Sequence, residues 1–294
     1  MLTKHRLMYV TLAVRDLSRS RQFYEEVLGL PALDPDDTSV SYPLGHVVLT
    51  LIRTSDPAVP LGERDRSLTL TLLVDDMRAV GAAMDERGGS LRPAQTSRAG
   101  TMADLYDPDG HWLCLYEASE AAMSWPSGGK IRALRRAAGD GPGLELLYVF
   151  LYVHDLHATE KFYQGTLGLV PLEVNTCHRG VTAVPDGVVK YDAGGVLLTT
   201  HHVGDAEHAA EHRVTVEGSA GVALGFHTAD LDAATTELSS RGLAFTGESP
   251  VSPIGVAAGF ADPGGHRYYL CQPSAETMAR PSGAAIQRIL RADL

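Results

Sequence analysis

The chain has 294 residues, of which 44% are hydrophobic, and its formal net charge is −11 at pH 7. This length is sufficient for two domains with cores of ordinary size, and the acidic balance argues against nucleic acid as a partner. The longest apolar runs, such as residues 146–153, are far shorter than the roughly 20 residues of a membrane-spanning helix, and the N-terminus has no apolar signal core.

The first predicted unit, which we call A, begins with a short apolar strand at residues 9–14. Asp16-Leu17 follows this strand, and Asp16 can cap a helix by accepting its first N–H groups. Phe23-Tyr24 and Leu28-Gly29-Leu30 come next, where apolar residues recur near helical spacing and Gly29 ends the helix. Further strands follow, the last at residues 46–52, so the unit reads βαβββ.

The second unit, which we call B, has the same pattern of elements. Asp76-Met77 marks its helix, and its closing strand at residues 111–116 follows the motif Asp107-Pro108-Asp109-Gly110-His111. Residues 124–143 are rich in Gly, Pro and basic side chains, which is typical of a linker, although residues 131–138 could form a short helix.

Both units then return, in the same order, as units A′ and B′. Asp155-Leu156, Phe162-Tyr163 and Leu167-Gly168-Leu169 repeat unit A, and Asp262-Pro263-Gly264-Gly265-His266 repeats unit B. Two long, non-identical copies indicate a duplicated domain rather than a solenoid. We place the first domain at residues 1–120, a linker at 121–143, the second domain at 144–273 and a C-terminal tail at 274–294.

This order of motifs resembles the vicinal oxygen chelate superfamily, which includes glyoxalases, extradiol dioxygenases and bleomycin-binding proteins. The resemblance covers residues 7–117 and 146–272. It implies an α+β fold in which four βαβββ units pair into two cup-shaped mixed-sheet domains. Members of that superfamily share the cup and differ in chemistry, so the fold alone does not identify a reaction.

The resemblance also allows the family's metal site to be tested by position. Metal-binding members carry a ligand, often His, about seven residues before the Asp of each Asp-Leu motif, and a Glu on the closing strand. The corresponding residues of this chain are Tyr9, Thr69, Tyr148, Ala223, Thr50, Cys114, Thr199 and Tyr269. A divalent ion needs several converging His, Cys or carboxylate ligands, so we expect no metal and no cofactor.

Alternation along the strands predicts which side chains face the inside of each cup. If each cup is made of consecutive units, the second cup is the richer one, with three aromatic residues on one strand. Such a composition suits a planar or apolar ligand that is oriented by a few polar groups. The predicted ligand-binding residues are Tyr148, Phe150, Tyr152, Thr199, His201 and Tyr269.

His227 and Arg267 are the candidate catalytic residues of the same cup. His227 could act as a general base or hydrogen-bond donor, and Arg267 could hold a carboxylate or enolate oxygen. A structural histidine, an arginine exposed at the sheet rim and aromatic residues that fill a closed core are the competing interpretations. The segment from His208 to His212 matches the HxxEH spacing of zinc peptidases, which we attribute to chance.

Three functions agree with these features. We favour a metal-independent protein that sequesters or carries a small aromatic or hydrophobic molecule. The alternatives are a metal-free isomerase, cyclase or lyase that uses His, Arg and Tyr, and a metal-dependent dioxygenase or glyoxalase-like enzyme with displaced ligands such as His201 and His227. Three widely spaced cysteines fit a reducing compartment, so we expect a cytoplasmic location. We expect no membrane partner, and a homodimer is the assembly that we consider.

Overall fold

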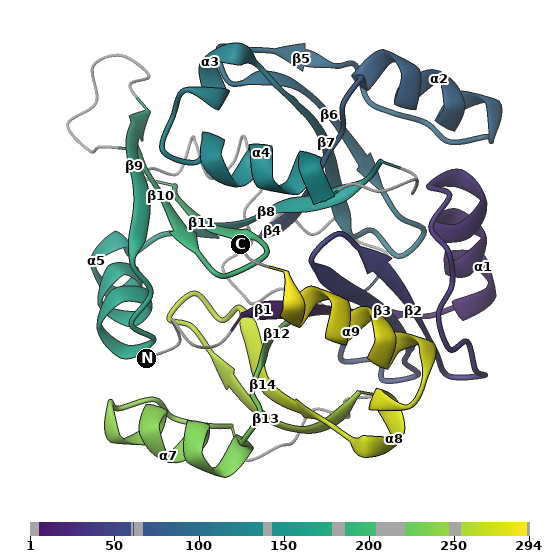
Figure 1. Cartoon of the computed structure of the whole chain (residues 1–294). Coiled ribbons are helices and arrows are strands. Elements are labelled where there is room, and N and C mark those ends of the chain that lie inside the picture. Colours follow the sequence, from purple (N-terminus) through teal and green to yellow (C-terminus); the bar gives the residue numbers. More distant parts are fainter. Residues whose placement is uncertain are drawn as a thin grey trace.

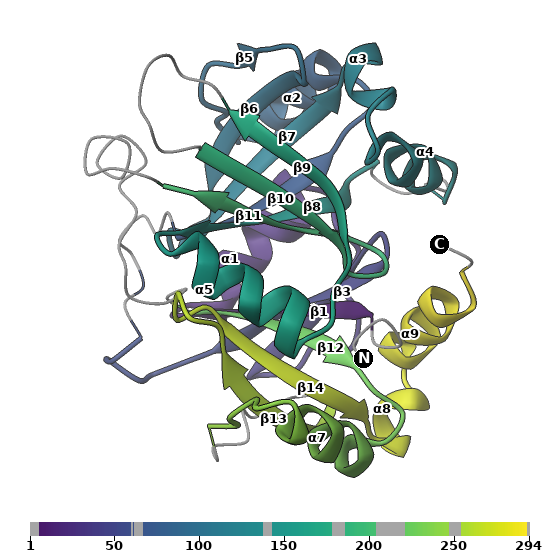
Figure 2. The same ribbon diagram turned by 90° about the vertical axis from the view of Figure 1, so that its left-hand side faces the viewer.

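The computed structural model describes residues 6–59, 61, 67–137, 143–177, 186–203, 221–246 and 254–292. Two mixed β-sheets lie one above the other, with helices around them (Figure 1; Figure 2). The predicted α+β class with two mixed sheets is therefore confirmed. The segment from His208 to His212 lies outside the described residues.

The strands of each unit follow the order that the motifs predict. Unit A contains β1 (Leu7–Val14), β2 (Ser39–Leu44) and β3 (Val47–Arg53), and unit B contains β4 (Leu68–Leu73), β5 (Gln95–Thr96), β6 (Gly100–Tyr106) and β7 (Trp112–Ala118). Unit A′ contains β8 (Glu145–Val153), β9 (Pro171–Cys177), β10 (Asp186–Asp192) and β11 (Leu197–His202). Unit B′ contains β12 (Val222–His227), β13 (Gly255–Ala261) and β14 (Arg267–Pro273). In unit A an isolated bridge between Leu33 and Ser41 takes the place of one predicted strand.

Each unit carries one helix that follows its first strand. These helices are α1 (Leu17–Gln22), α2 (Met77–Glu86), α5 (Leu156–Glu160) and α7 (Leu231–Ser240), and α1 and α5 continue into π-helical turns (Phe23–Val27 and Lys161–Thr166). The capping role predicted for Asp16 is confirmed and holds for Asp155 in the repeated motif, because each carboxylate accepts the backbone N–H three residues later. Asp76 and Asp230 do the same for α2 and α7.

The units pair crosswise, and the expectation that consecutive units build each cup is wrong. The six-stranded sheet has the order β13-β14-β12-β1-β3-β2 and joins unit A to B′, whereas the eight-stranded sheet, β5-β6-β7-β4-β8-β11-β10-β9, joins B to A′. The joints are the antiparallel pairs β1·β12 and β4·β8. Motifs identify units, but pairing between strand edges is a long-range property that short motifs do not encode. Each sheet therefore draws strands from both predicted domains, whose boundaries stay a prediction.

Side chains on the outer faces of both sheets share one hydrophobic core. Val10 and Leu12 of the six-stranded sheet belong to the same buried cluster as Leu70 and Val149 of the eight-stranded sheet. Two hydrogen bonds link the sheets as well, from Tyr24 Oη to Asp107 Oδ2 at 2.9 Å and from Tyr163 Oη to Asp262 Oδ2 at 2.6 Å. The repeated Phe-Tyr and Asp-Pro motifs thus meet between the sheets.

The predicted linker and tail contain matching helices. α3 (Glu120–Met123) and α4 (Gly128–Ala137) follow unit B, and α8 (Ala275–Met278) and α9 (Pro281–Arg291) follow unit B′. Ile286 and Ile289 of α9 pack on the six-stranded sheet, and Ile131 and Leu134 of α4 pack on the eight-stranded sheet. Both segments are therefore parts of the duplicated fold, and each helix covers part of one concave face (Figure 1).

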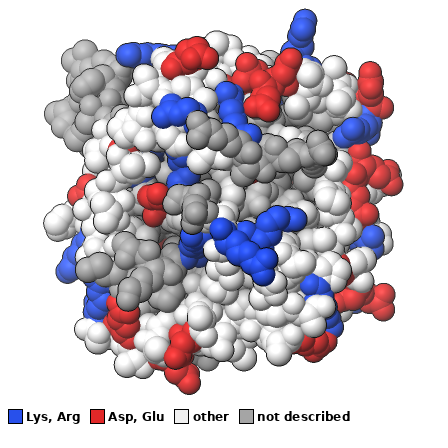
Figure 3. Space-filling model, viewed as in Figure 1, with Lys and Arg blue, Asp and Glu red and all other residues white. Residues whose placement is uncertain are grey.

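The surface on the side of α4 and α9 carries positively and negatively charged side chains. Lys and Arg gather near the centre of this face, while Asp and Glu lie mostly toward its edges (Figure 3). Among the described residues, no helix is both long and apolar enough to cross a membrane.

Glu145, the first residue of β8, is a buried carboxyl group at the junction of the two sheets. A side chain on Gly45, in the turn between β2 and β3, would collide with its carboxylate. Its Oε2 atom has no hydrogen-bond partner within the described ranges. Burial, and to a smaller extent Asp75, raises the pKa of Glu145 from 4.5 to about 7.

We predict that Glu145 makes stability depend on pH. Between pH 4.5 and about 7 the folded state retains a proton that the unfolded state loses, so the free energy of unfolding falls as pH rises. The loss from this group amounts to about 3 kcal/mol at pH 7. Glu145→Gln removes the titration, so urea denaturation should show a gap between variant and wild type that widens across this range. A gap that does not vary with pH would contradict the prediction.

Candidate functional site

A cavity of about 900 Å³ lies on the concave face of the eight-stranded sheet. This volume lies within the range of sites that enclose drug-sized molecules. Strands from both halves of the chain contribute to its walls, because units B and A′ form this sheet together. Its lining residues are Thr69, Thr71, Arg92, Pro93, Gln95, Ala99, Met102, Asp104, Trp112, Cys114, Tyr116, Trp125, Tyr148, Phe150, Tyr152, Val188, Lys190 and His201.

Aromatic rings form two groups along the cavity. In the first, Trp112 and Tyr152 stack with ring centroids 5.7 Å apart and planes only 4° from parallel, and His201 lies 5.4 Å from Tyr152. In the second, Tyr148 lies 5.9 Å from Tyr116 and 5.3 Å from Phe150. Tyr148 and Tyr152 are four residues apart on β8, which corresponds to about 13 Å along the strand. The cavity therefore offers flat apolar surfaces near both ends.

A buried ion pair lies at the Tyr148 end of the cavity. Lys190 Nζ donates to Glu173 Oε1 at 2.7 Å, and the side chains are 7% and 3% exposed. The same ammonium lies 5.3 Å from the ring centroids of Trp125 and Tyr148. Burial alone would raise the pKa of Glu173, but hydrogen bonds from Lys190 and Ser127 outweigh burial and lower it.

Other polar groups lie along the walls. The Thr69 hydroxyl is buried and has no hydrogen-bond partner in the part of the chain that the structure describes. Burial raises the pKa of the Cys114 thiol, with a further contribution from the neighbouring Asp104, so this thiol stays protonated at neutral pH. Tyr116 Oη donates to the carbonyl of Ala99 at 2.8 Å, and burial raises its pKa to about 12. The buried walls thus offer neutral hydroxyl and thiol groups together with one compensated cation, while Arg92 is exposed and Asp104 is half-buried.

The structure brings four predicted ligand-binding residues together. Tyr148, Phe150, Tyr152 and His201 all line the cavity. Thr199 is fully buried and pairs with Phe150 on the neighbouring strand, but it does not line the cavity. The binding roles of these residues stay predictions, and their grouping follows from the inward alternation of β8 and β11.

The other predicted site residues lie on the six-stranded sheet. His227 Nδ1 is 2.9 Å from Tyr9 Oη, and Tyr269 Oη is 2.9 Å from Thr11 Oγ1. Arg267 is exposed at the start of β14. Because β12 and β14 pair with unit A rather than with A′, these three residues do not meet the aromatic cavity. A metal site that combines His201 with His227 is not formed either, since the two lie on different sheets.

Sequence reasoning placed part of the cavity in the wrong cup and missed another part. Alternation along the closing strand of unit B predicts that Trp112, Cys114 and Tyr116 face the inside of a cup, but pairing of consecutive units would place them opposite unit A rather than unit A′. Lys190 and Trp125 were not predicted at all. Val188 and Lys190 are two residues apart on β10, so alternation along this strand could have predicted that both face the cavity. No local feature of the sequence indicates that the segment containing Trp125 packs against the sheet.

The residues at the family's metal positions do not suit a divalent ion. In the six-stranded sheet the hydroxyls of Tyr9, Tyr269 and Thr50 hydrogen-bond to protein side chains. Burial raises the pKa of the phenols of Tyr9, Tyr148 and Tyr269, so these groups remain protonated. Thr and Ala occupy most of the other positions. Neutral hydroxyls of this kind cannot replace imidazole and carboxylate ligands.

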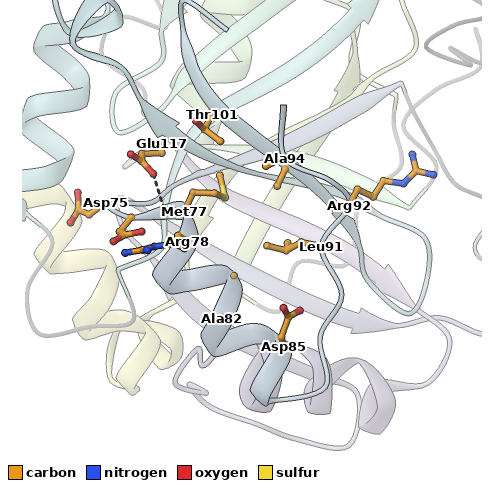
Figure 4. A pocket seen from close by; sticks show the side chains of 13 residues that line it. Asp75, Met77, Arg78, Ala82, Asp85, Leu91, Arg92, Ala94, Thr101 and Glu117 are labelled. Atoms are coloured by element: carbon orange, nitrogen blue, oxygen red, sulfur yellow. Dashed lines mark hydrogen bonds between the residues drawn. The ribbon is translucent and has the colours of Figure 1, made fainter. Parts of the chain in front are cut away.

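A second hollow, of about 820 Å³, lies between α2 and the strands β6 and β7 (Figure 4). Asp76, Arg78, Ala82 and Asp85, on or next to α2, are exposed there. The Glu117 carboxylate is engaged, because it accepts the backbone N–H of Met77 at 2.8 Å. This hollow lacks the aromatic walls and buried polar groups of the first cavity, which we therefore regard as the candidate site.

Comparison with known proteins agrees with this architecture. The family model "Glyoxalase/Bleomycin resistance protein/Dioxygenase superfamily" matches residues 6–115 and 145–269. A protein named catechol-2,3-dioxygenase from Bacillus subtilis is 27% identical over 221 residues, which are 67% of this chain and 72% of that protein.

Solved structures show the same fold over nearly the whole chain. Glyoxalase I from Zea mays superposes with a TM-score of 0.59 at 19% identity, covering 97% of this chain and 95% of that one. A putative dioxygenase from Bacillus subtilis also gives 0.59, at 15% identity and 98% coverage of both chains. Together with the matched family model, the duplicated βαβββ units show that this chain belongs to the glyoxalase/bleomycin resistance protein/dioxygenase superfamily.

Proposed function

We propose that this protein binds a small planar aromatic or hydrophobic molecule in the cavity of the eight-stranded sheet, without a metal, and sequesters or carries it. The observation that carries the proposal is the cavity itself, which combines aromatic surfaces at both ends with buried polar groups. The side chains at the family's metal positions are mostly neutral hydroxyl groups, which bind divalent ions poorly, and this supports binding without a metal. The name of the Bacillus relative refers to catechol, a small aromatic molecule of the same class.

The energetics of such binding come mainly from the rings. Each aromatic contact contributes about 0.5 to 1.5 kcal/mol beyond the burial of apolar area. Phe150 and Tyr152 are half-buried on the cavity wall, so part of each ring remains available for a ligand. The rigid strand β8 holds both rings in place, which limits the conformational entropy lost on binding.

The metal-free enzyme that uses His227 and Arg267 has less support. Tyr9, the hydrogen-bond partner of His227, is fully buried among side chains of the six-stranded sheet and of α9. Neither His227 nor Arg267 lines the aromatic cavity. A metal-dependent oxidation of an aromatic molecule would need ligands that neither concave face supplies within the described residues.

One prediction from this proposal concerns the aromatic wall. Phe150→Ala should weaken the binding of fluorene, a planar tricyclic hydrocarbon, by about tenfold, because the variant removes both a ring contact and apolar area. Equilibrium dialysis with chromatographic quantification of the ligand measures the dissociation constants.

Variants on the other sheet provide the controls for this measurement. Thr11 occupies the position of unit A that corresponds to Phe150, so Thr11→Ser should leave fluorene binding unchanged. His227→Asn should do the same. Equal weakening by Phe150→Ala and by either control would show that the ligand is not bound in the cavity.

Another prediction from this proposal concerns metal content. Freshly purified protein should contain far less than one equivalent of iron, manganese, nickel or zinc per chain, because the donor groups at the family's positions are neutral. Elemental analysis by mass spectrometry checks this. One tightly held ion per chain that is lost on His201→Ala or His227→Ala would instead favour a metal-dependent enzyme.

A further inference from the structure

Lys190 is the one buried cation among the described residues that line the cavity. Its side chain is 7% exposed, and it reaches the cavity between Trp125 and Tyr148. Glu173, which compensates its charge, does not line the cavity. The pair therefore presents the ammonium, and not the carboxylate, to a bound molecule.

The duplicated fold provides an internal comparison for this pair. On β10 Lys190 pairs with Thr199, and in the same register of unit A Ser41 pairs with Thr50. Glu173 lies opposite Lys190, whereas Leu33 lies opposite Ser41. The same architecture thus forms in the six-stranded sheet without an ion pair at these positions.

One role of Glu173 is structural and needs no lysine. Glu173 Oε2 accepts the backbone N–H of Ser127, just before α4, at 3.0 Å. In the other half of the chain Asp34 Oδ2 accepts the corresponding N–H of Ser282 at 2.9 Å. Lys190 compensates the charge of the buried Glu173 carboxylate, but a buried ion pair contributes little to stability on balance, so this compensation alone does not favour the pair over two neutral residues.

The ammonium of Lys190 retains donor capacity toward the cavity. Of its three N–H groups, one donates to Glu173 Oε1 at 2.7 Å and another to Ser127 Oγ at 3.3 Å. No third acceptor lies within reach in the described part of the chain. An acceptor atom of a ligand could complete the set.

A second donor lies in the same row of the sheet. Register places Lys190, Thr199, Phe150 and Thr69 side by side on four neighbouring strands. Thr69 lines the cavity and is 3% exposed, and its hydroxyl has no partner among the described residues. Two donors thus flank the ring of Phe150, and unsatisfied buried polar groups are costly unless a ligand engages them.

We propose that Lys190 donates a hydrogen bond to an oxygen atom of the ligand, so that the cavity selects neutral planar aromatic molecules that carry a carbonyl or hydroxyl group. This inference rests on the proposed binding function and names its ligand class. Because Glu173 already compensates the charge of Lys190, a neutral acceptor suits the site better than a carboxylate. Thr69 provides a second polar contact on the opposite side of Phe150.

The test compares two probes of nearly equal shape, 9-fluorenone and fluorene, which differ by one carbonyl oxygen. Equilibrium dialysis should show that the wild-type protein binds fluorenone about tenfold more tightly, as expected for a hydrogen bond from a charged donor. The double variant Lys190→Met with Glu173→Gln should lose this preference and bind fluorene as the wild type does. It removes both charges and leaves an amide oxygen to accept the Ser127 N–H.

Two further variants keep the test decisive. Lys190→Ser copies the residue found in unit A and should also abolish the preference, whereas Ser41→Ala, at the matching position of the other sheet, should preserve it. Equal binding of both probes by the wild type, or a preference that survives both Lys190 variants, would overturn the role of Lys190 and leave the binding function intact. Failure of both probes to bind at their solubility limits would overturn the proposed function itself.

Discussion

The antiparallel pairs β1·β12 and β4·β8 are the constraint on which the rest of this structure depends. They join each unit to one from the other half of the chain, so neither half completes a sheet by itself. The outer faces of both sheets can then merge into one core, and the hydrogen bonds from Tyr24 and Tyr163 link the two sheets at two equivalent places. Trp112 and Tyr152 stack in one wall only because of this exchange. The candidate site is thus built by one unit from each half of the chain.

Local features of the fold could be predicted from the sequence because their causes are local. A carboxylate at Asp16 or Asp155 caps the helix that immediately follows it, and alternation along β8 determines that Tyr148 and Phe150 face the same side. The partner of each strand depends on contacts between residues far apart in the chain, and no short motif records that choice. His227 was therefore assigned to the same cup as His201 when it lies on the other sheet. The short helix considered at residues 131–138 overlaps α4, whereas α9 was not predicted, because its segment was interpreted as a tail.

The two concave faces show how one architecture supports different interiors. In the six-stranded sheet Gly225 leaves room for the ring of Tyr269, whose hydroxyl is bonded to Thr11, and Tyr9 is bonded to His227. The hydroxyl groups of Tyr9 and Tyr269 therefore have hydrogen-bond partners within the sheet, and both rings are packed in a buried cluster with side chains of α9. In the eight-stranded sheet Thr71 takes the place of Gly225 and Cys114 that of Tyr269, and the space above them stays open. Differences in side-chain volume at matched positions therefore separate a packed concave face from an open one.

The positions of the two tryptophans have a practical consequence. The chain contains two Trp residues, and Trp112 and Trp125 both line the candidate cavity, near opposite ends of β8. Trp125 lies close to the Lys190 ammonium, while Trp112 is stacked on Tyr152. Indole emission responds to nearby charge, to ring stacking and to exclusion of water. The intrinsic fluorescence of this protein therefore comes from the walls of one cavity, and the six-stranded sheet is spectroscopically silent by comparison.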